Sequence, residues 1–566
     1  MPKIEVYEKS LHRFCGFSVN HQELEGRLQA AKAELDDIDP AQGILKIELN
    51  DTNRPDLWST AGLGRQLRIH SGGEIPEYDF FSSVNEAKDS AHRRIDVDPA
   101  LENIRPYVAA FAFTGKPIDE PMLKDLIQTQ EKLCWNYGQK RRSIAMGVYR
   151  SDLMEYPVRY RAADPDKTRF KPLQAEKVMN LHEILDQHPK GRDFGFIVKK
   201  YALYPFLDDS KGEVLSFPPI INSDNLGAVQ VGDNNLFVEM TGTDIKSLVL
   251  ALSIVACDLA DGGYEILPVK TVYPYDTELG REVVCPYYFQ TPLSVDIDVV
   301  KKVLGENLVV DEAARHCRSM GLSTEVSGFS LQVRVPEYRN DFMHPVDIVE
   351  DIMIGRGTNN FEPVMPSQFT AGRITSESEY GRAIKETMIG LGYQEMIYNY
   401  LGSRRDLIER MHILDSVLLE VANPMSESFG YVRNSTIPSL LASEAVSAHA
   451  VYPHAIFEVG KVAFRDSDDN QGCVTRNHLG FLYADREADY NQVMSHVSAV
   501  FYYLNREFSL RECDDPRLVP GRRADILCDG GYVGVVGEIH PEILEEWGIQ
   551  MPSAACELDL DLLMGG

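Results

Sequence analysis

Four carboxylates near the middle of the chain are spaced so that one hard cation could bind them. Asp341 precedes a predicted helix that begins near Pro345, a residue suited to the first helical turn. In that helix Asp347, Glu350 and Asp351 share one face, because they are three and four residues apart. Oxygen ligands alone favour Mg²⁺ over Zn²⁺. From the spacing alone, a solvated acidic helix start favoured by the helix dipole is the more common arrangement.

Two polar residues interrupt an apolar strand further upstream. If Leu236, Val238 and Met240 face the core, Glu239 and Thr241 point together to the opposite face of the strand. There they could line a pocket or face water, and the residues leave both alternatives open.

A third cluster interleaves aromatic and basic side chains between Trp135 and Arg142. Such a pattern could stack a base and contact phosphate groups. A solvated basic loop is the more common alternative, and the pattern alone does not exclude it.

Composition restricts the function classes. The chain has 566 residues and a formal net charge of −29, so a nucleic-acid role needs local basic patches or a basic partner. Its nine cysteines occur without a C-x-x-C pair, and there is no H-E-x-x-H motif, which indicates a reducing compartment and no zinc site. The N-terminus does not resemble a signal peptide, and no uncharged apolar stretch reaches ~18 residues. We therefore expect a cytoplasmic protein without a membrane segment.

The periodicity of apolar residues predicts a multidomain protein of mixed α/β and α+β class. The predicted domains are a small α/β unit over 1–85, a strand-rich domain over 86–275, a winged-helix-like domain over 280–362 and a domain with a largely antiparallel sheet over 368–566. Helices are expected at 23–33, 59–70, 124–133, 297–304, 310–320, 376–391 and 440–449. Strands are expected at 4–6, 44–49, 107–113, 331–335, 455–459 and 532–539.

The helix at 59–70 follows the turn-rich block Asn50–Ser59. Taken alone, this block predicts a capped helix start, in which Asp51 or Asp56 accepts from backbone N–H groups and Arg54 pairs with an acid.

Several segments together resemble one known family, the β subunits of phenylalanyl-tRNA synthetases, in the shorter archaeal and eukaryotic form. The resemblance covers essentially every predicted domain. It rests on the segments 50–59, 215–223, 237–244, 335–357, 520–524 and 536–541.

The resemblance implies two sites. It implies a structural Mg²⁺ near the contact with an α subunit, at Asp341, Asp347, Glu350 and Asp351. It also implies that residues 86–275 form an editing domain that hydrolyses tRNA mischarged with tyrosine. The implied pocket residues are Leu207, Ser216, Glu239 and Thr241, and the family pattern often has aspartate at the position of Glu239.

The last domain resembles a class II synthetase catalytic domain that does not catalyse, because it has no glycine-rich G-x-G-x-E-R segment to bind ATP. The resemblance implies that ATP and phenylalanine bind to the α subunit, in an α2β2 heterotetramer that acts on tRNA(Phe). Two alternatives remain open: a freestanding Mg²⁺-dependent phosphoester hydrolase that uses the four carboxylates, and a pure RNA-docking scaffold with a dead editing pocket.

Overall fold

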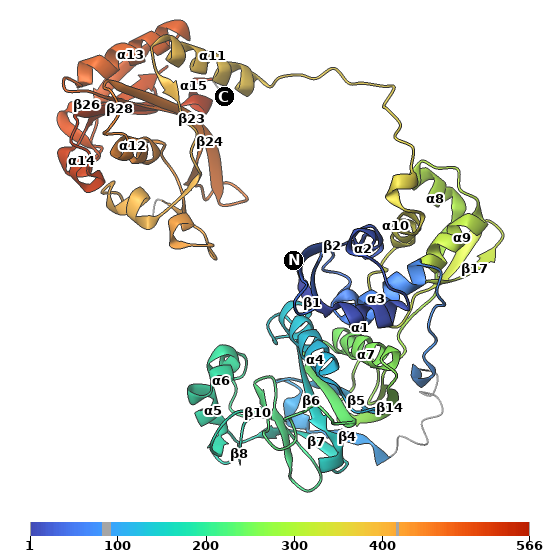
Figure 1. Ribbon diagram of the computed structural model, residues 1–566. Helices are drawn as coiled ribbons and strands as arrows, with labels where there is room; N and C mark the ends of the chain where they lie inside the picture. Colours follow the sequence, from blue (N-terminus) through green and yellow to red (C-terminus); the bar gives the residue numbers. More distant parts are fainter. Residues whose placement is uncertain (1, 82–91, 415–417, 565–566) are drawn as a thin grey trace. The chain divides into compact units, whose positions relative to one another are not determined.

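The computed structural model describes residues 2–81, 92–414 and 418–564. The chain divides between Val364 and Met365 into two compact units (Figure 1), and each is described by itself. Several sheets and many helices make up both units, which confirms the predicted mixed multidomain class. The predicted boundary between residues 85 and 86 lies outside the described residues.

The first unit begins with a three-stranded antiparallel sheet in the order β1-β3-β2. Its elements are β1 (Lys3–Tyr7), α1 (Glu8–Cys15), α2 (His21–Leu28), β2 (Ala33–Asp39), β3 (Ile44–Leu49) and α3 (Thr60–His70). The predicted strands at 4–6 and 44–49 are confirmed. The helix predicted over 23–33 is too long, because a 3-10 turn follows Leu28 and β2 begins at Ala33.

Helix α3 begins at a different cap from the one predicted. The Oγ of Ser59 accepts from the backbone N–H of Gly62, so the prediction that Asp51 or Asp56 caps this helix is wrong. Arg54 does pair with an acid, Asp56. A Cβ on Gly64 would lie 2.4 Å from the Cβ of Phe14 in α1, so glycine permits the close packing of α3 on α1.

The next part of the unit is built on a large sheet in the order β12-β11-β10-β7-β4-β14-β5-β13-β6, with β15 paired to β14. The strands are β4 (Arg94–Val97), β5 (Tyr107–Thr114), β6 (Ile144–Arg150), β7 (Val158–Ala163), β10 (Tyr204–Asp208), β11 (Val214–Phe217), β12 (Ile221–Asn222), β13 (Asn235–Gly242), β14 (Glu265–Val272) and β15 (Glu282–Cys285). The pairs β4–β14 and β4–β7 are parallel, and the other pairs are antiparallel.

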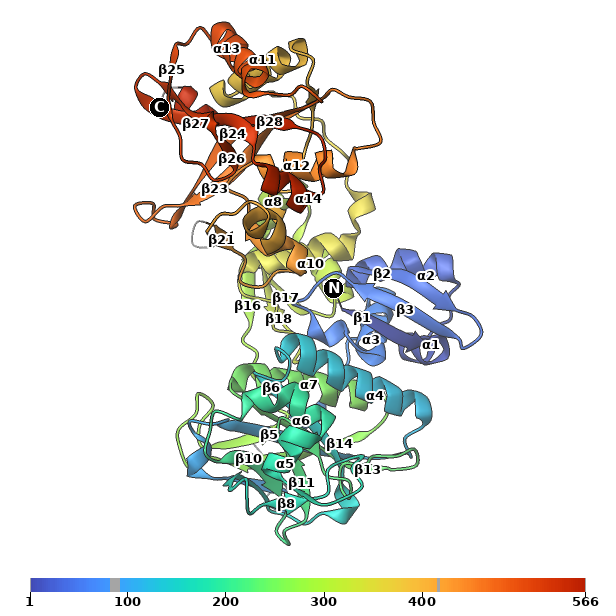
Figure 2. The same ribbon diagram turned by 90° about the vertical axis from the view of Figure 1, so that its left-hand side faces the viewer.

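Four helices accompany this sheet: α4 (Glu120–Lys132), α5 (Leu181–Gln187), α6 (Pro189–Phe194) and α7 (Ile245–Asp261). The apolar helix α7 packs on β5, β13 and β14, and Figure 2 shows α4 beside it above the strands. A small pair, β8 (Arg169–Phe170) and β9 (Met179–Asn180), lies near α5. The predicted strand at 107–113 is confirmed to within one residue, and the helix predicted at 124–133 is confirmed but begins four residues earlier.

The last part of the first unit has a sheet in the order β16-β18-β17 and three helices. The elements are β16 (Leu293–Asp296), α8 (Ile297–Leu304), α9 (Val310–Ser319), β17 (Ser323–Ser327), β18 (Ser330–Arg334) and α10 (Pro345–Arg356). The predicted helices at 297–304 and 310–320 and the helix start at Pro345 are confirmed.

The second unit is built on a sheet in the order β19-β23-β24-β28-β27-β26-β25, in which only the β19–β23 pair is parallel. Its strands are β19 (Gln394–Glu395), β23 (His454–Arg465), β24 (Cys473–Ala484), β25 (Phe508–Glu512), β26 (Leu518–Cys528), β27 (Gly531–Ile539) and β28 (Ser553–Asp559). Its helices are α11 (Ser376–Gly390), α12 (Ile437–Val446), α13 (Tyr490–Tyr503), α14 (Pro541–Trp547) and α15 (Leu560–Leu563). A smaller sheet contains β20 (Leu401–Gly402), β22 (Tyr431–Val432) and β21 (Leu419–Glu420).

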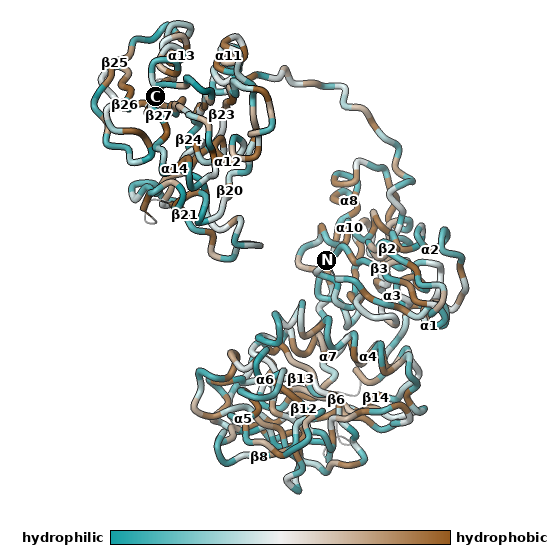
Figure 3. The backbone as a smooth tube through the Cα atoms, turned by 60° about the vertical axis from the view of Figure 1, so that its left-hand side comes forward, coloured by the Kyte–Doolittle hydropathy of each residue, from teal (hydrophilic) through white to brown (hydrophobic). Residues whose placement is uncertain are grey.

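This arrangement confirms the predicted antiparallel character of the last domain. The helix predicted over 440–449 begins earlier, because Pro438 lies in the first turn of α12, where its missing N–H costs nothing. Figure 3 shows apolar residues concentrated along elements such as α7, in which every residue from 248 to 259 is buried. No described helix is long and apolar enough to cross a membrane.

Candidate functional site

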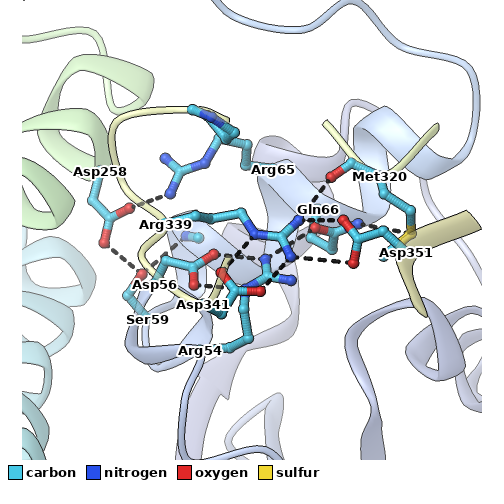
Figure 4. A network of polar contacts seen from close by, with 12 residues as sticks. Arg54, Asp56, Ser59, Arg65, Gln66, Asp258, Met320, Arg339, Asp341 and Asp351 are labelled. Atoms are coloured by element: carbon cyan, nitrogen blue, oxygen red, sulfur yellow. Dashed lines mark hydrogen bonds and ion pairs between the residues drawn. The ribbon is translucent and has the colours of Figure 1, made fainter. Parts of the chain in front are cut away.

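The four acidic residues of the predicted metal site each contact a protein group. Arg339 lies between two of them: it forms ion pairs of 2.6 Å with Asp341 and 2.7 Å with Asp351 (Figure 4). Asp347 accepts from the backbone N–H groups of Met343 and His344, both at 2.7 Å, and thereby caps α10.

Glu350 forms an ion pair with Lys32, which also pairs with Asp51 at 2.7 Å. Among the described residues, no three or more histidine, cysteine, aspartate or glutamate side chains are arranged to hold a metal ion. As arranged here, the four carboxylates do not form a group that could hold one cation, and each contacts a donor of the protein instead. Magnesium binding at Asp341, Asp347, Glu350 and Asp351 stays a prediction, and no chemical step below uses it.

Electrostatics support the role of Arg339 as the cation of this cluster. Burial opposes ionisation of Asp341, but the guanidinium groups of Arg339 and Arg54 outweigh it and lower the pKa of that carboxyl to about 2. Burial raises the pKa of Asp351, and Arg339 offsets only part of that effect. Sequence reasoning considered carboxylates alone and missed Arg339, although it lies two residues before Asp341.

The block Asn50–Ser59 belongs to the same buried network, which connects α3 to α7. Arg65 pairs with Asp261 at 2.8 Å. It also pairs with Asp258 at 3.1 Å, and the Oγ of Ser59 donates to Asp258 at 2.6 Å (Figure 4). Burial raises the pKa of Asp258 to about 7, although Arg65 opposes this shift. These contacts join α3 and the end of the block to α7 within the first unit.

The predicted pocket residues lie on three strands of the large sheet. Leu207 on β10 is the cross-strand partner of Ser216 on β11. Glu239 and Thr241 lie on β13 between β5 and β6, and both are buried, at 2% and 0% exposure. Of the two alternatives for this pair, exposure to water is therefore wrong.

Tyr149 on β6 connects these strands. Its hydroxyl donates to the Oε1 of Glu239 at 2.8 Å and lies 3.5 Å from the Oδ1 of Asn222, the cross-strand partner of Ser216. A Cβ on Gly147 would lie 1.9 Å from that hydroxyl, so only glycine leaves room for the Tyr149 ring. Sequence patterns contain no signal for Tyr149, because its contact with Glu239 depends on the register between β6 and β13.

Two buried polar atoms of this cluster have no partner among the described residues: the Oγ of Ser216 and the Oε2 of Glu239. Burial raises the pKa of Glu239 to about 7, and Tyr149 and Arg105 offset part of that shift. A carboxyl with this pKa can donate or accept a hydrogen bond near neutral pH. Buried polar atoms without partners are rare and mark places where a ligand group or water binds. We call Ser216, Glu239, Tyr149 and Thr241 the polar cluster.

In the second unit, charged groups on one face of the sheet are paired. Arg433 forms two hydrogen bonds with Glu458, at 2.7 and 2.9 Å, and Glu557 accepts from Thr436 and pairs with His478. A Cβ on Gly480 would lie 1.9 Å from the Oγ1 of Thr436, so α12 begins directly against this face. Because Arg433 and His478 already pair with carboxylates of the protein, they are not free to bind phosphate groups.

Comparisons with known proteins give consistent results. The model of the phenylalanyl tRNA synthetase beta chain CLM domain matches residues 362–560, and the model of the tRNA synthetase B5 domain matches residues 293–357. The phenylalanine–tRNA ligase beta subunits of Borrelia recurrentis (strain A1) and Borrelia turicatae (strain 91E135) are 45% and 46% identical to this chain over 565 residues, with 100% of both chains covered. A crystal structure of an N-terminal fragment of the phenylalanyl-tRNA synthetase beta subunit from Pyrococcus horikoshii matches with a TM-score of 0.59 and 35% identity, over 63% of this chain and 100% of the fragment.

Proposed function

The chain belongs to the family of phenylalanine–tRNA ligase beta subunits, and we propose that it is the proofreading, non-activating partner of an α chain in an α2β2 heterotetramer. In this assembly the α chain binds ATP and phenylalanine and forms Phe-tRNA(Phe), and the β chain contacts tRNA(Phe) and edits Tyr-tRNA(Phe). We assign it to the short, archaeal and eukaryotic form and to the cytoplasm. The four predicted domains, over 1–85, 86–275, 280–362 and 368–566, are part of the same proposal.

The absence of amino-acid activation in this chain is supported by its second unit. An adenylate needs cationic groups on its phosphates. The sequence has no glycine-rich G-x-G-x-E-R segment, and Arg433 is buried against Glu458. Activation therefore falls to the α chain, and the second unit serves as its scaffold.

Editing at the polar cluster is supported by one observation above all, the two unpartnered atoms of Ser216 and Glu239. A pocket that accepts tyrosine and refuses phenylalanine needs buried polar groups for the phenol, because unmet hydrogen bonds can discriminate by a factor of ~10⁴. The Oε2 of Glu239 and the Oγ of Ser216 supply such groups. Without a phenol, both atoms stay unsatisfied, so phenylalanine binds poorly.

The reaction is ester hydrolysis. Water adds to the carbonyl carbon of the tyrosyl ester, the bond from that carbon to the ribose oxygen breaks, and the ribose oxygen takes up a proton. No Ser-His-Asp arrangement occurs in the cluster, so water held by polar groups and the ribose hydroxyl of the tRNA is favoured over a covalent intermediate. Glu239 and Ser216 position the substrate in this scheme.

The experiment compares the α2β2 complex carrying Glu239→Ala or Thr241→Ala with the wild-type complex. We expect hydrolysis of Tyr-tRNA(Phe) to fall about 10- to 100-fold in each variant, because each loses a buried hydrogen-bonding group. The exposed residue Glu176 of the same domain provides a matched control, Glu176→Ala. Undiminished hydrolysis in both cluster variants would exclude these residues from the editing site.

The same preparation separates the alternatives. A freestanding Mg²⁺-dependent hydrolase predicts phosphoester cleavage by the lone β chain that Asp347→Ala abolishes. A docking scaffold predicts aminoacylation by the complex without any hydrolysis of Tyr-tRNA(Phe). The proposed function predicts aminoacylation only with the α chain present, together with hydrolysis that depends on Glu239.

A further inference from the structure

We propose that a basic surface beside the polar cluster binds the single-stranded 3′ end of an RNA, with one backbone phosphate in a pocket above Arg105. We call this the basic-aromatic surface, and it consists of Trp135, Lys140, Arg142, Phe196, Lys200 and Tyr201. The inference deepens the proposed function and rests on it for the identity of the RNA, which would be the 3′ end of tRNA(Phe).

The pocket is lined by one buried basic side chain, Arg105, and by two exposed ones, Arg142 and Lys200. It has a volume of about 360 Å³, and Arg105, Arg142, Lys200, Phe196 and Tyr201 are among its lining residues. Phosphate oxygens are the anionic groups that arginine and lysine recognise most readily in nucleic acids. The lining therefore has the composition of a phosphate subsite.

Arg105 is the most informative residue of the pocket because it is 2% exposed and has no carboxylate in hydrogen-bonding contact. Its guanidinium donates to the Oγ1 of Thr241 at 2.9 Å, to the carbonyl of Thr241 and to the carbonyl of Arg142 at 3.0 Å. Burial lowers the pKa of Arg105, and Glu239 opposes that shift through its charge alone, without a hydrogen bond to the guanidinium. A buried charge without a paired counter-charge is costly, so an anion in the adjoining pocket would offset that cost.

Exposed aromatic rings accompany the cations. The Nζ of Lys140 lies 5.3 Å from the ring centre of Trp135, and the guanidinium of Arg142 lies 5.1 Å from that of Phe196. These two rings are 52% and 48% exposed, so both are accessible to a ligand. No ion pair of Lys140, Arg142 or Lys200 occurs in the described part of the chain. Free cations beside exposed rings suit a chain that offers phosphates and bases alternately.

The local charge is opposite to that of the whole chain. Residues 140–142 and 190–200 contain seven basic residues and one acidic residue, in a protein with a net charge of −29. Figure 1 shows α6 and its neighbour α5 at one side of the large sheet, where the second of these segments begins. A strongly acidic chain that concentrates cations in one place creates a local attraction for phosphates.

The backbone of this surface is held in an uncommon conformation. Gln139, Lys140 and Arg141 have φ values of 51°, 56° and 66°, so three successive residues with a Cβ adopt the left-handed region. Each carries a steric penalty, and such strain occurs most often at functional sites. The guanidinium of Arg141 donates to the carbonyls of Pro219 and Ile220 at 3.1 and 2.9 Å, which fixes the turn.

Two arginines join this surface to the polar cluster. Arg105 contacts Thr241 of the cluster, and Arg141 contacts the loop that follows Ser216 on β11. An RNA end held on the surface therefore ends beside the atoms proposed to receive its aminoacyl group. The 3′ end is favoured over duplex RNA because stacking on Trp135 and Phe196 needs unpaired bases.

The test uses the α2β2 complex and a short fluorescent single-stranded RNA that ends in CCA. Its dissociation constant is measured by fluorescence anisotropy over a series of KCl concentrations. For the double variant Arg142→Ala/Lys200→Ala we expect at least about tenfold weaker binding and a slope of log K against log salt that is shallower by about 1.4, because each lost phosphate contact contributes ~0.7. The matched control is Lys167→Ala/Lys211→Ala, which removes two exposed lysines of the same domain.

A second variant keeps the charges and removes a ring. We expect Trp135→Ala to weaken binding about tenfold without a change of the salt slope, because stacking involves no counterion release. Affinity and slope equal to those of the lysine control in both variants would overturn the inference.

Kinetics separate this inference from the proposed function. In a complex that hydrolyses Tyr-tRNA(Phe), Arg142→Ala/Lys200→Ala should raise KM and leave kcat near the wild-type value. If the wild-type complex hydrolyses no Tyr-tRNA(Phe), the proposed editing function fails. The RNA-binding measurement then still decides the inference on its own, through the loss of affinity in the two variants.

Discussion

The buried ion pairs of Arg339 can be tested by Arg339→Met, which removes the guanidinium and keeps a long side chain. The side chains of Asp341 and Asp351 are 10% and 5% exposed and both pair with Arg339. Removing one partner of a buried ion pair leaves the other charge without compensation and costs about 3–5 kcal/mol. We expect the free energy of unfolding of the first unit to fall by this amount at pH 7.

The pH dependence provides an independent check of the same network. In the wild type, the pKa of Asp341 is lowered from 3.8 to about 2, so its contribution of about 2 kcal/mol is present above pH 4 and is lost as the pH falls through 2. In Arg339→Met, the pKa of Asp351, which burial already raises, rises further, and the pKa of Asp341 rises from about 2 because only Arg54 still lowers it. Their protonation then stabilises the folded state, so the loss of stability in the variant becomes smaller as the pH falls from 7 to 5.

The assay is urea unfolding followed by circular dichroism, at pH 7 and pH 5. The control is Arg94→Met, because Arg94 pairs with Asp96 at the surface and such pairs contribute about 1 kcal/mol or less. A second check is Arg339→Met combined with Asp341→Asn and Asp351→Asn, which should recover part of the lost stability. The reasoning would be refuted if Arg339→Met unfolded at the same urea concentration as the control at both pH values.

Two further variants test the polar cluster and the second unit. Gly147→Ala should destabilise the protein by about 1–3 kcal/mol and reduce Tyr-tRNA(Phe) hydrolysis, because the added Cβ would displace Tyr149. The control Gly26→Ala has nothing within 4 Å of the added Cβ and should stabilise the protein slightly. Thermal unfolding of both variants measures these changes. Glu557 and Asp559 raise the pKa of His478 to about 9 against the opposing effect of burial, so its stabilising contribution is full below pH 6.5 and disappears as the pH rises through 9. His478→Gln should therefore lower the melting temperature at pH 6 and leave it nearly unchanged at pH 10, and an equal loss at both pH values would contradict this assignment.

Elements whose signals are local were predicted well from the sequence. The apolar spacing in α8 gave its bounds, and Pro345 marked the first turn of α10. Such signals depend on residues within a few positions of one another, so they survive without knowledge of the fold. The shared face of Glu239 and Thr241 was predicted on the same basis, from the alternation of a strand.

Contacts between distant residues were not predicted. Glu350 pairs with Lys32, which is 318 residues away in the sequence, and Tyr149 reaches Glu239 through strand register. The spacing of carboxylates on one helix face therefore suggested a cation without revealing that Arg339 already supplies one. The choice between pocket and solvent for Glu239 required the neighbouring strands that bury it.

The network of Arg65 also affects how the chain folds during translation. Asp258 follows Arg65 by 193 residues, so at 5–20 residues per second the ribosome needs roughly 10–40 s after Arg65 to synthesise the chain as far as Asp258. During that interval α3 lacks its counter-charges, and the N-terminal sheet cannot reach its final stability before α7 is synthesised. Chimaeras that exchange one part between relatives must for the same reason carry both members of each charge pair.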